Sequence, residues 1–229
     1  MIGRRLGAAV IALAFPVAVL GLGVRAAMSR AFLAFEYGRP GFPADQFGFS
    51  TDDRMLYGSY GLDYILNDAG PRYLGDLVFR SGEPVFTAGE VSHMTDVKHV
   101  LGTGLDVSLW LGVAAVVVAL LMRSWRHVAA GLRWGVALTV LGIAAMAVVA
   151  ATAWERFFAW VHSLFFASGT WTFSVNDTLI RVYPEQFWRD AALLIAVVVA
   201  ACCALALIAS RRAPRSGLRS RRARRSSGA

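Results

Sequence analysis

The sequence predicts an all-α membrane protein with four transmembrane helices. A small extracytoplasmic cap is expected between spans one and two, and an aromatic-rich outer loop between spans three and four. The 229-residue chain is 57% hydrophobic with positive mean hydropathy, which is too apolar for an ordinary soluble domain. It contains four uncharged runs near the length of about 20 residues that crosses a membrane. We expect one membrane domain over 1–210, with spans at about 6–25, 101–122, 134–154 and 190–210.

The distribution of charge predicts the orientation of these spans. Arginines without acidic residues precede the first run, separate the second from the third, and follow the fourth. All 15 Asp and Glu residues lie within 36–106 or 155–190. The positive-inside rule therefore places both termini in the cytoplasm and the cap and outer loop outside. The net charge of +8 averages a basic inside and a slightly acidic outside, so it does not indicate nucleic-acid binding.

The first span has a second interpretation as a cleaved signal peptide. Arg4 and Arg5 would be its basic start, and residues 24–26 lie near a possible cleavage site. The apolar run at 6–24 exceeds the usual signal-peptide core of about 7–15 residues, which favours a transmembrane helix.

Residues 28–98 form the predicted cap. Its start at 37–43 is rich in glycine and proline and should be irregular. Residues 50–53, Ser-Thr-Asp-Asp, offer an N-cap for a helix that reaches about Asn67. The segment is too small and too rich in loops to hold a large core alone, so we expect it to lie on the ends of the spans.

The end of the cap should lead directly into the second span. Residues 77–86 carry two short apolar stretches on either side of the turn Ser-Gly-Glu-Pro at 81–84, which is the pattern of a small hairpin. Ser92 or Thr95 is the expected N-cap of a helix that continues into the second span. The loop after that span, 123–133, is basic and contains His127, which we expect to be a surface residue.

The outer loop, 155–189, should begin as a helical continuation of the third span. We expect this helix to end at Gly169, and Asn176 to cap a short helix over 177–182. Pro184 should then open the fourth span. The continuation carries one stripe at three- and four-residue spacing, formed by Trp154, Phe158, His162 and Phe165.

We expect no reactive residues in the last span or in the tail. Cys202 and Cys203 are adjacent within the span and are expected to be apolar packing residues. Residues 211–229 hold eight arginines and should form a disordered cytoplasmic tail that binds anionic phospholipid. Non-specific nucleic-acid binding is the less favoured alternative.

Two histidines are the candidate reactive groups. His93 and Asp96 are three residues apart at an expected helix start, where a carboxylate could orient an imidazole base. His162 lies among aromatic residues that would keep it neutral. Both belong to segments on the same predicted membrane face. A surface ion network around His93 and a packed core histidine at 162 are the alternatives.

Metal binding and serine hydrolysis fit the sequence less well. His93 and His99 are six residues apart and face different sides of a helix, unlike a zinc-binding pair four apart. Ser92 and Ser163 each adjoin a histidine, which is poor geometry for attack assisted by that same residue. We expect no metal and no cofactor.

Two blocks of sequence resemble the lipoprotein intramolecular transacylase (Lit) family. They are 93–98, HMTDVK, and 161–166, VHSLFF, and the resemblance extends over the four-span layout. Further matching residues follow the second block and are Trp171, Phe173, Asp177, Leu179, Ile180, Pro184 and Phe187.

This resemblance implies a bacterial multi-pass enzyme that acts outside the cytoplasm on diacylglyceryl-modified lipoproteins. The reaction would move the sn-2 acyl chain to the α-amino group of the lipoprotein's N-terminal cysteine. The nucleophile belongs to the substrate, so the enzyme needs an acid and a base but no serine or cysteine of its own.

The expected catalytic residues are His93 and His162, with Asp96 orienting His93. Lys98, or backbone amides near Asn176, would serve the oxyanion. The remaining expected site residues are Glu90 and Asp177 as supports and Phe158, Phe165 and Trp171 as contacts to the substrate. A non-catalytic protein that binds lipid or peptide, and a related acyltransferase or lipase, are the alternatives.

Overall fold

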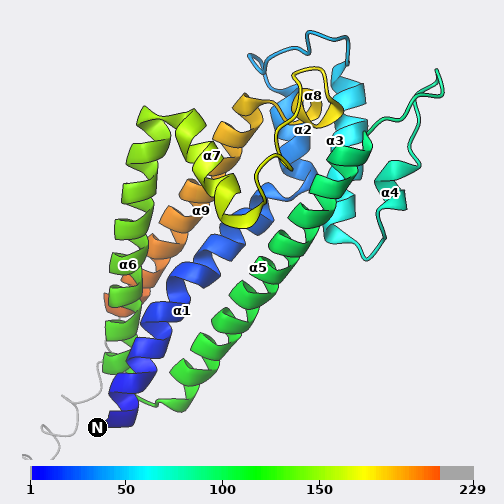
Figure 1. Cartoon of the computed structure of the whole chain (residues 1–229). Helices are drawn as coiled ribbons and strands as arrows, with labels where there is room; N and C mark the ends of the chain where they lie inside the picture. Colours follow the sequence, from blue (N-terminus) through cyan, green and yellow to red (C-terminus); the bar gives the residue numbers. More distant parts are fainter. Residues whose placement is uncertain (1, 212–229) are drawn as a thin grey trace, which may run out of the picture.

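Four long helices span the structure, a computed structural model that describes residues 2–211 (Figure 1). Each is long and apolar enough to cross a membrane. Helix α1 contacts the other three, so it lies at the centre of the bundle. This arrangement confirms the predicted fold class. Residues 212–229 of the expected tail lie outside the described residues. The four helices are α1 (Ile2–Ala27), α5 (Ala88–Leu121), α6 (Trp125–Thr152) and α9 (Glu185–Arg211).

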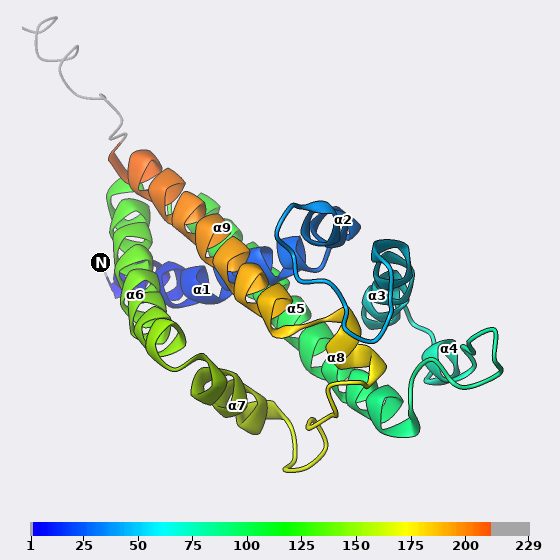
Figure 2. The same ribbon diagram turned by 90° about the horizontal axis from the view of Figure 1, so that it is seen from above.

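The short helices gather at one end of the bundle, which we call the cap end (Figures 1 and 2). They are α2 (Arg30–Gly38), α3 (Thr51–Leu66), α4 (Arg72–Gly75), α7 (Trp154–Phe165) and α8 (Thr178–Val182). The opposite end carries the start of α1 and the turn between α5 and α6. From that turn α5 and α6 diverge, and α1 contacts both.

The cap shares its core with the long helices. One buried cluster joins α2 and α3 to α8 and α9, and a second joins α3 and α4 to α8 and the first turns of α5. The expectation that the cap lies on the ends of the spans is therefore confirmed. The first cluster contains Met28, Phe32, Leu33, Tyr37, Leu62, Val182, Phe187 and Ala191. The second contains Tyr64, Leu74, Val85, Phe86, Met94 and Leu179.

The helix starts follow side-chain capping. Helix α3 has its N-cap within 50–53, as predicted: Ser50 caps it, and the structure adds a reciprocal capping box with Asp53. Helix α5 begins earlier than expected, because Thr87 and Glu90 form a second capping box. The prediction of Ser92 or Thr95 as this cap is wrong, although the helix does continue into the second span.

The turn around 77–86 contains one antiparallel bridge, between Val78 and Pro84, with a left-handed backbone at Gly82. A glycine fits there because it lacks the Cβ atom that makes a positive φ costly. The expected hairpin is thus reduced to a tight turn.

The basic loop expected at 123–133 is mostly helical. Helix α6 starts at Trp125 and includes Arg126 and Arg133, because arginine is a good helix former and can extend its charge beyond the apolar surface. His127 is half-buried, and its Nδ1 lies 2.8 Å from Ser124 Oγ.

The expected continuation of the third span as one helix is wrong. Helix α6 ends at Thr152, and Ala153 adopts φ −152° and ψ 62°, outside the helical region. Helix α7 then turns toward α5 and ends at Phe165 rather than Gly169 (Figures 1 and 2). Asp177, not Asn176, is the N-cap of α8, and α9 follows Pro184 as predicted.

Candidate active site

Two histidines from distant parts of the chain lie side by side at the cap end. His93 is on the second turn of α5, and His162 is near the end of α7. Their ring centroids are 6.2 Å apart and their planes differ by 24°. The break at Ala153 makes this possible because it directs α7 toward α5.

Four aromatic side chains surround the histidine pair, and we call them the aromatic enclosure. Phe166 and Phe173 contact the His93 ring, with centroid separations of 4.9 and 5.4 Å. Phe158 and Trp171 contact the His162 ring, at 4.0 and 5.0 Å. The pair therefore lies in an apolar environment, in which His93 is buried and His162 is half-buried.

This environment keeps both imidazoles neutral at physiological pH. Burial, and after it repulsion from a charge on His162, lowers the pKa of His93 to about 4. Asp96 opposes these two effects only weakly. Burial also lowers the pKa of His162. Two neutral imidazoles can accept and return protons without a permanent charge in the site.

The hydrogen bond of His162 determines which nitrogen is available. Its Nδ1 lies 2.9 Å from the carbonyl oxygen of Phe158. A carbonyl only accepts hydrogen bonds, so Nδ1 must carry the proton. The neutral ring then presents Nε2 as a lone pair, which is the state that a general base requires.

Two polar atoms of the site are buried without a hydrogen-bond partner. They are His93 Nδ1 and Trp171 Nε1. His93 as a whole is only 8% exposed. Because buried polar groups are nearly always paired in folded proteins, these two atoms are available to a bound molecule.

Glu90 supports the site without contacting either histidine ring. Its carboxylate is fully buried and accepts the backbone N–H of Thr87 at 2.7 Å and of Leu179 at 2.6 Å. Burial raises the pKa of Glu90, and both backbone N–H groups oppose that rise. The side chain thus links the start of α5, which carries His93, to α8.

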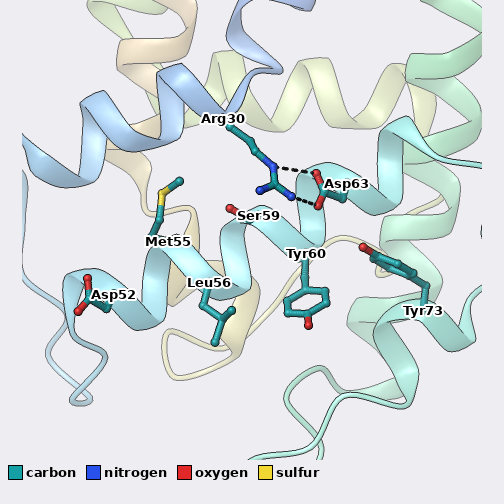
Figure 3. Close-up of a pocket in the computed structure, with 8 residues that line it drawn as sticks. All are labelled: Arg30, Asp52, Met55, Leu56, Ser59, Tyr60, Asp63 and Tyr73. Carbon is teal, nitrogen blue, oxygen red and sulfur yellow. Dashed lines mark hydrogen bonds and ion pairs between the residues drawn. The ribbon is translucent and has the colours of Figure 1, made fainter.

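A hollow elsewhere on the cap contains neither histidine. It has a volume of about 570 Å³ and lies against α3, where Arg30 pairs with Asp63 (Figure 3). The other side chains that line it are Asp52, Met55, Leu56, Ser59, Tyr60 and Tyr73. None of the residues that line it belongs to the aromatic enclosure, so the hollow is a separate surface feature.

Comparison with known proteins identifies the family. The family model described as lipoprotein intramolecular transacylase Lit matches residues 9–188. The chain belongs to the Lit family. An uncharacterized protein of Aquifex aeolicus is 31% identical over 195 residues, which cover 85% of this chain and 88% of that protein.

Solved structures of the family share the fold. The membrane-integral lipoprotein intramolecular transacylase Lit from Bacillus cereus superposes with a TM-score of 0.70 at 21% identity, over 89% of this chain and 92% of that one. A variant of the same protein with one histidine replaced by arginine gives a TM-score of 0.64 at 17% identity, covering 91% and 90% of the two chains. The chain is therefore a multi-pass membrane protein with the Lit fold.

Several of the predicted site residues of this Lit family chain form no described hydrogen bond or ring contact with the histidine pair. Asp96 is exposed, and within residues 2–211 it forms no hydrogen bond to His93. Asp177 accepts the backbone N–H of Ser174 at 2.7 Å and so stabilises the turn before α8. Phe165 is 57% exposed and contacts Phe166 rather than a histidine.

Lys98 is occupied within the cap. Its Nζ donates to the carbonyl oxygen of Ala69 at 2.6 Å and to Asn67 Oδ1 at 3.3 Å, and it lies 4.4 Å from the Tyr64 ring centroid. These contacts leave it as a structural residue that connects α5 to the end of α3.

Phe166 and Phe173 were not predicted as site residues, although Phe166 ends the second block that resembles the family and Phe173 is among the matching residues after it. Each packs against His93. The available signal was the density of aromatic residues just after His162, but spacing along the chain does not tell which of them turn toward α5.

Proposed function

We propose that this protein is a lipoprotein intramolecular transacylase. It moves the sn-2 acyl chain of a diacylglyceryl-cysteine lipoprotein to the α-amino group of that same cysteine, which leaves a lyso-lipoprotein. The observation that carries the proposal is the pair of neutral imidazoles, 6.2 Å apart, inside an aromatic enclosure at the cap end of a membrane bundle. Membership of the Lit family supports the same reaction.

The reaction first needs an unprotonated amine. An α-amino group has a pKa of about 7.7–8.0, so much of it is protonated at neutral pH. His162 presents Nε2 as a free base because its Nδ1–H is bound to Phe158. We assign His162 the removal of the amine proton as the nitrogen–carbon bond forms.

The leaving glyceryl oxygen then needs a proton. When the tetrahedral intermediate collapses, the carbon–oxygen bond breaks and the alkoxide takes up one proton, which balances the one lost by the amine. His93 adjoins His162 and has a buried ring nitrogen without a partner. We assign His93 the hydrogen bond to this oxygen. The proton that His162 took from the amine passes through His93 to the oxygen, so both imidazoles are neutral again when the cycle ends.

The enclosure also explains why the acyl group reaches the amine rather than water. Amine and ester belong to one molecule, so holding them in reach makes the attack effectively unimolecular. Aromatic side chains around both histidines exclude water that would hydrolyse the ester. His93 precedes the expected span at 101–122, which places the site near the lipid headgroups.

The orientation follows from charge. Both termini lie in the cytoplasm and the cap end faces outward, because Arg4, Arg5, Arg126 and Arg133 are at the opposite end. The substrate therefore meets the site from the outer leaflet of a bacterial cell membrane. Labelling of a cysteine introduced at exposed Glu83 by a membrane-impermeant reagent in intact cells tests this orientation, and protection there would reverse it.

The deciding experiment is mass spectrometry of lipoprotein N-termini in cells that lack and then regain the protein. The native chain should convert the diacyl form to the N-acyl lyso form, whereas His93→Ala and His162→Ala should lower conversion by at least about 100-fold. His127→Ala is the matched control, since His127 lies at the other end of the bundle. Unchanged lipoproteins would favour a binding protein, and released fatty acid would favour a lipase.

A further inference from the structure

The indole N–H of Trp171 is a buried donor without a partner. Nε1 is inaccessible to solvent and has no hydrogen bond in the structure. An indole nitrogen can only donate. Trp188, by contrast, donates its Nε1–H to the carbonyl oxygen of Tyr183 at 3.0 Å. Since an unpaired buried donor is unfavourable, its presence in a reactive site calls for a transient acceptor.

Trp171 lies beside the proposed general base. Its ring lies 5.0 Å from that of His162 and tilts by 38°. The third unpaired buried atom in residues 2–211, Trp125 Nε1, lies on the first residue of α6 at the opposite end of the bundle. A buried indole without a partner is therefore not by itself a sign of reactivity, and what distinguishes Trp171 is its contact with His162.

Of the donors expected to serve an oxyanion, the side chain of Lys98 is engaged elsewhere. Lys98 Nζ donates to Ala69 and Asn67 within the cap. Glu90 is a buried acceptor of two backbone N–H groups. His162 Nδ1–H is bound to Phe158. Around the His162 ring, the indole is thus a described side-chain donor whose hydrogen is uncommitted and which the acid and base roles do not use.

We propose that Trp171 Nε1–H is the oxyanion donor of the transacylation, an assignment that rests on the function proposed above. As the amine nitrogen bonds to the ester carbon, the carbonyl π electrons move to oxygen, and that oxygen accepts the indole hydrogen bond. Collapse restores the carbonyl as an amide and expels the glyceryl oxygen, which is then protonated. The indole gives up no proton during this cycle.

A neutral donor suits this site for two reasons. It adds no charge beside two imidazoles whose neutrality the reaction needs. In a water-excluded pocket, a preorganised hydrogen bond to developing charge is far stronger than in water, and removal of one such donor lowers kcat by about 10²–10³-fold. Trp171 also needs no reorganisation, because the aromatic enclosure already holds it against His162.

The experiment removes the N–H donor at position 171 in two ways, one of which keeps the shape of the ring. Trp171→Phe removes the donor with part of the ring. Incorporation of β-(3-benzothienyl)alanine at position 171 exchanges N–H for sulfur at nearly constant shape. The matched control is Trp160→Phe, since Trp160 is on α7 but is 51% exposed and contacts Phe157 rather than a histidine. Each protein is assayed in proteoliposomes with a synthetic diacylglyceryl-cysteine peptide, and kcat and KM are measured separately.

We expect both replacements at Trp171 to lower kcat by about 100-fold or more with little change in KM, and the control to keep both values. Normal kcat with the benzothienyl side chain would overturn the proposal, because the ring would then act by packing alone. A rise in KM without a fall in kcat would also overturn it. If the unaltered protein left the peptide unchanged, the function proposed above would fail instead.

Discussion

At the scale of single residues, the enclosure decides the chemistry of the histidine pair. An imidazole in water is partly charged near neutral pH, whereas His93 and His162 are both held neutral by burial. The hydrogen bond from His162 to Phe158 further selects one tautomer. The carbonyl oxygen of Phe158 therefore fixes the tautomer of His162, as a carboxylate does for the histidine of many acid–base sites.

The low pKa of His93 makes stability depend on pH. Its pKa is about 4 in the folded protein and about 6.5 when unfolded. Between these values the unfolded chain binds more protons, so stability is lost as pH falls from about 6.5 toward 4. We expect denaturant unfolding in micelles to show this slope, and His93→Gln to reduce it. An equal slope in the variant would contradict the assignment.

The sequence was sufficient to select the two histidines but not their partners. Both lie near span ends on one predicted membrane face, and the structure brings their rings together. Asp96 was expected to orient His93 because three-residue spacing shares a helix face, yet it points to solvent. Spacing fixes a face but not a rotamer, and Phe166 and Phe173 fill the position beside His93 instead.

At the scale of elements, a single buried carboxylate connects the helices that build the site. Glu90 completes the cap of α5 and also accepts the N–H of Leu179 in α8. The residues between α7 and α8 include Trp171 and Phe173, so the position of α8 constrains one side of the aromatic enclosure.

Replacement of Glu90 should therefore destabilise more than loss of a helix cap. Glu90→Ala leaves two backbone N–H groups without this acceptor and should lower the free energy of unfolding by about 2–3 kcal/mol. Thr87→Ala removes only the other half of the capping box and should lower it by about 1 kcal/mol. Thermal unfolding of both variants in detergent measures the difference, and equal losses would show that the Leu179 contact contributes little.

The sequence predicted most elements and missed the break between two of them. Residues 134–165 contain no proline or strong turn signal near Ala153, so helical periodicity appeared to continue. The break depends on packing of α7 toward α5, which is a tertiary effect. The start of α5 was predictable in principle, since Thr87 and Glu90 have the spacing of a capping box.

At the scale of the whole molecule, α1 holds the bundle together through close helix contacts. A Cβ atom added at Gly131 of α6 would lie 2.8 Å from the carbonyl oxygen of Ala8 and 2.9 Å from Ile11. This small residue lets the two backbones approach, as is usual where helices pack in membranes. Helix α9 contacts both α1 and α6.

A larger residue at Gly131 should separate α1 from α6. Gly131→Leu should lower the free energy of unfolding by about 1–3 kcal/mol or more through overpacking. Gly142→Leu is the matched control on the same helix, because no atom lies within 4 Å of its added Cβ, and it should change stability by less than about 0.5 kcal/mol. Unfolding in mixed micelles compares them; similar losses would refute this account of the α1–α6 contact.

The unbroken length of α5 has a consequence for the membrane in which the protein works. Its 34 residues make a rod of about 51 Å, against a hydrocarbon layer of about 30 Å. His93 stands about 12 Å along this rod from Leu101, where the expected span begins. The helix fixes the distance between the expected start of the span and His93. A thicker bilayer should therefore shift the substrate ester along α5, toward the imidazoles or beyond them. Turnover in vesicles of graded acyl-chain length should therefore pass through an optimum, and a flat response would show that the lipid adapts to the protein instead.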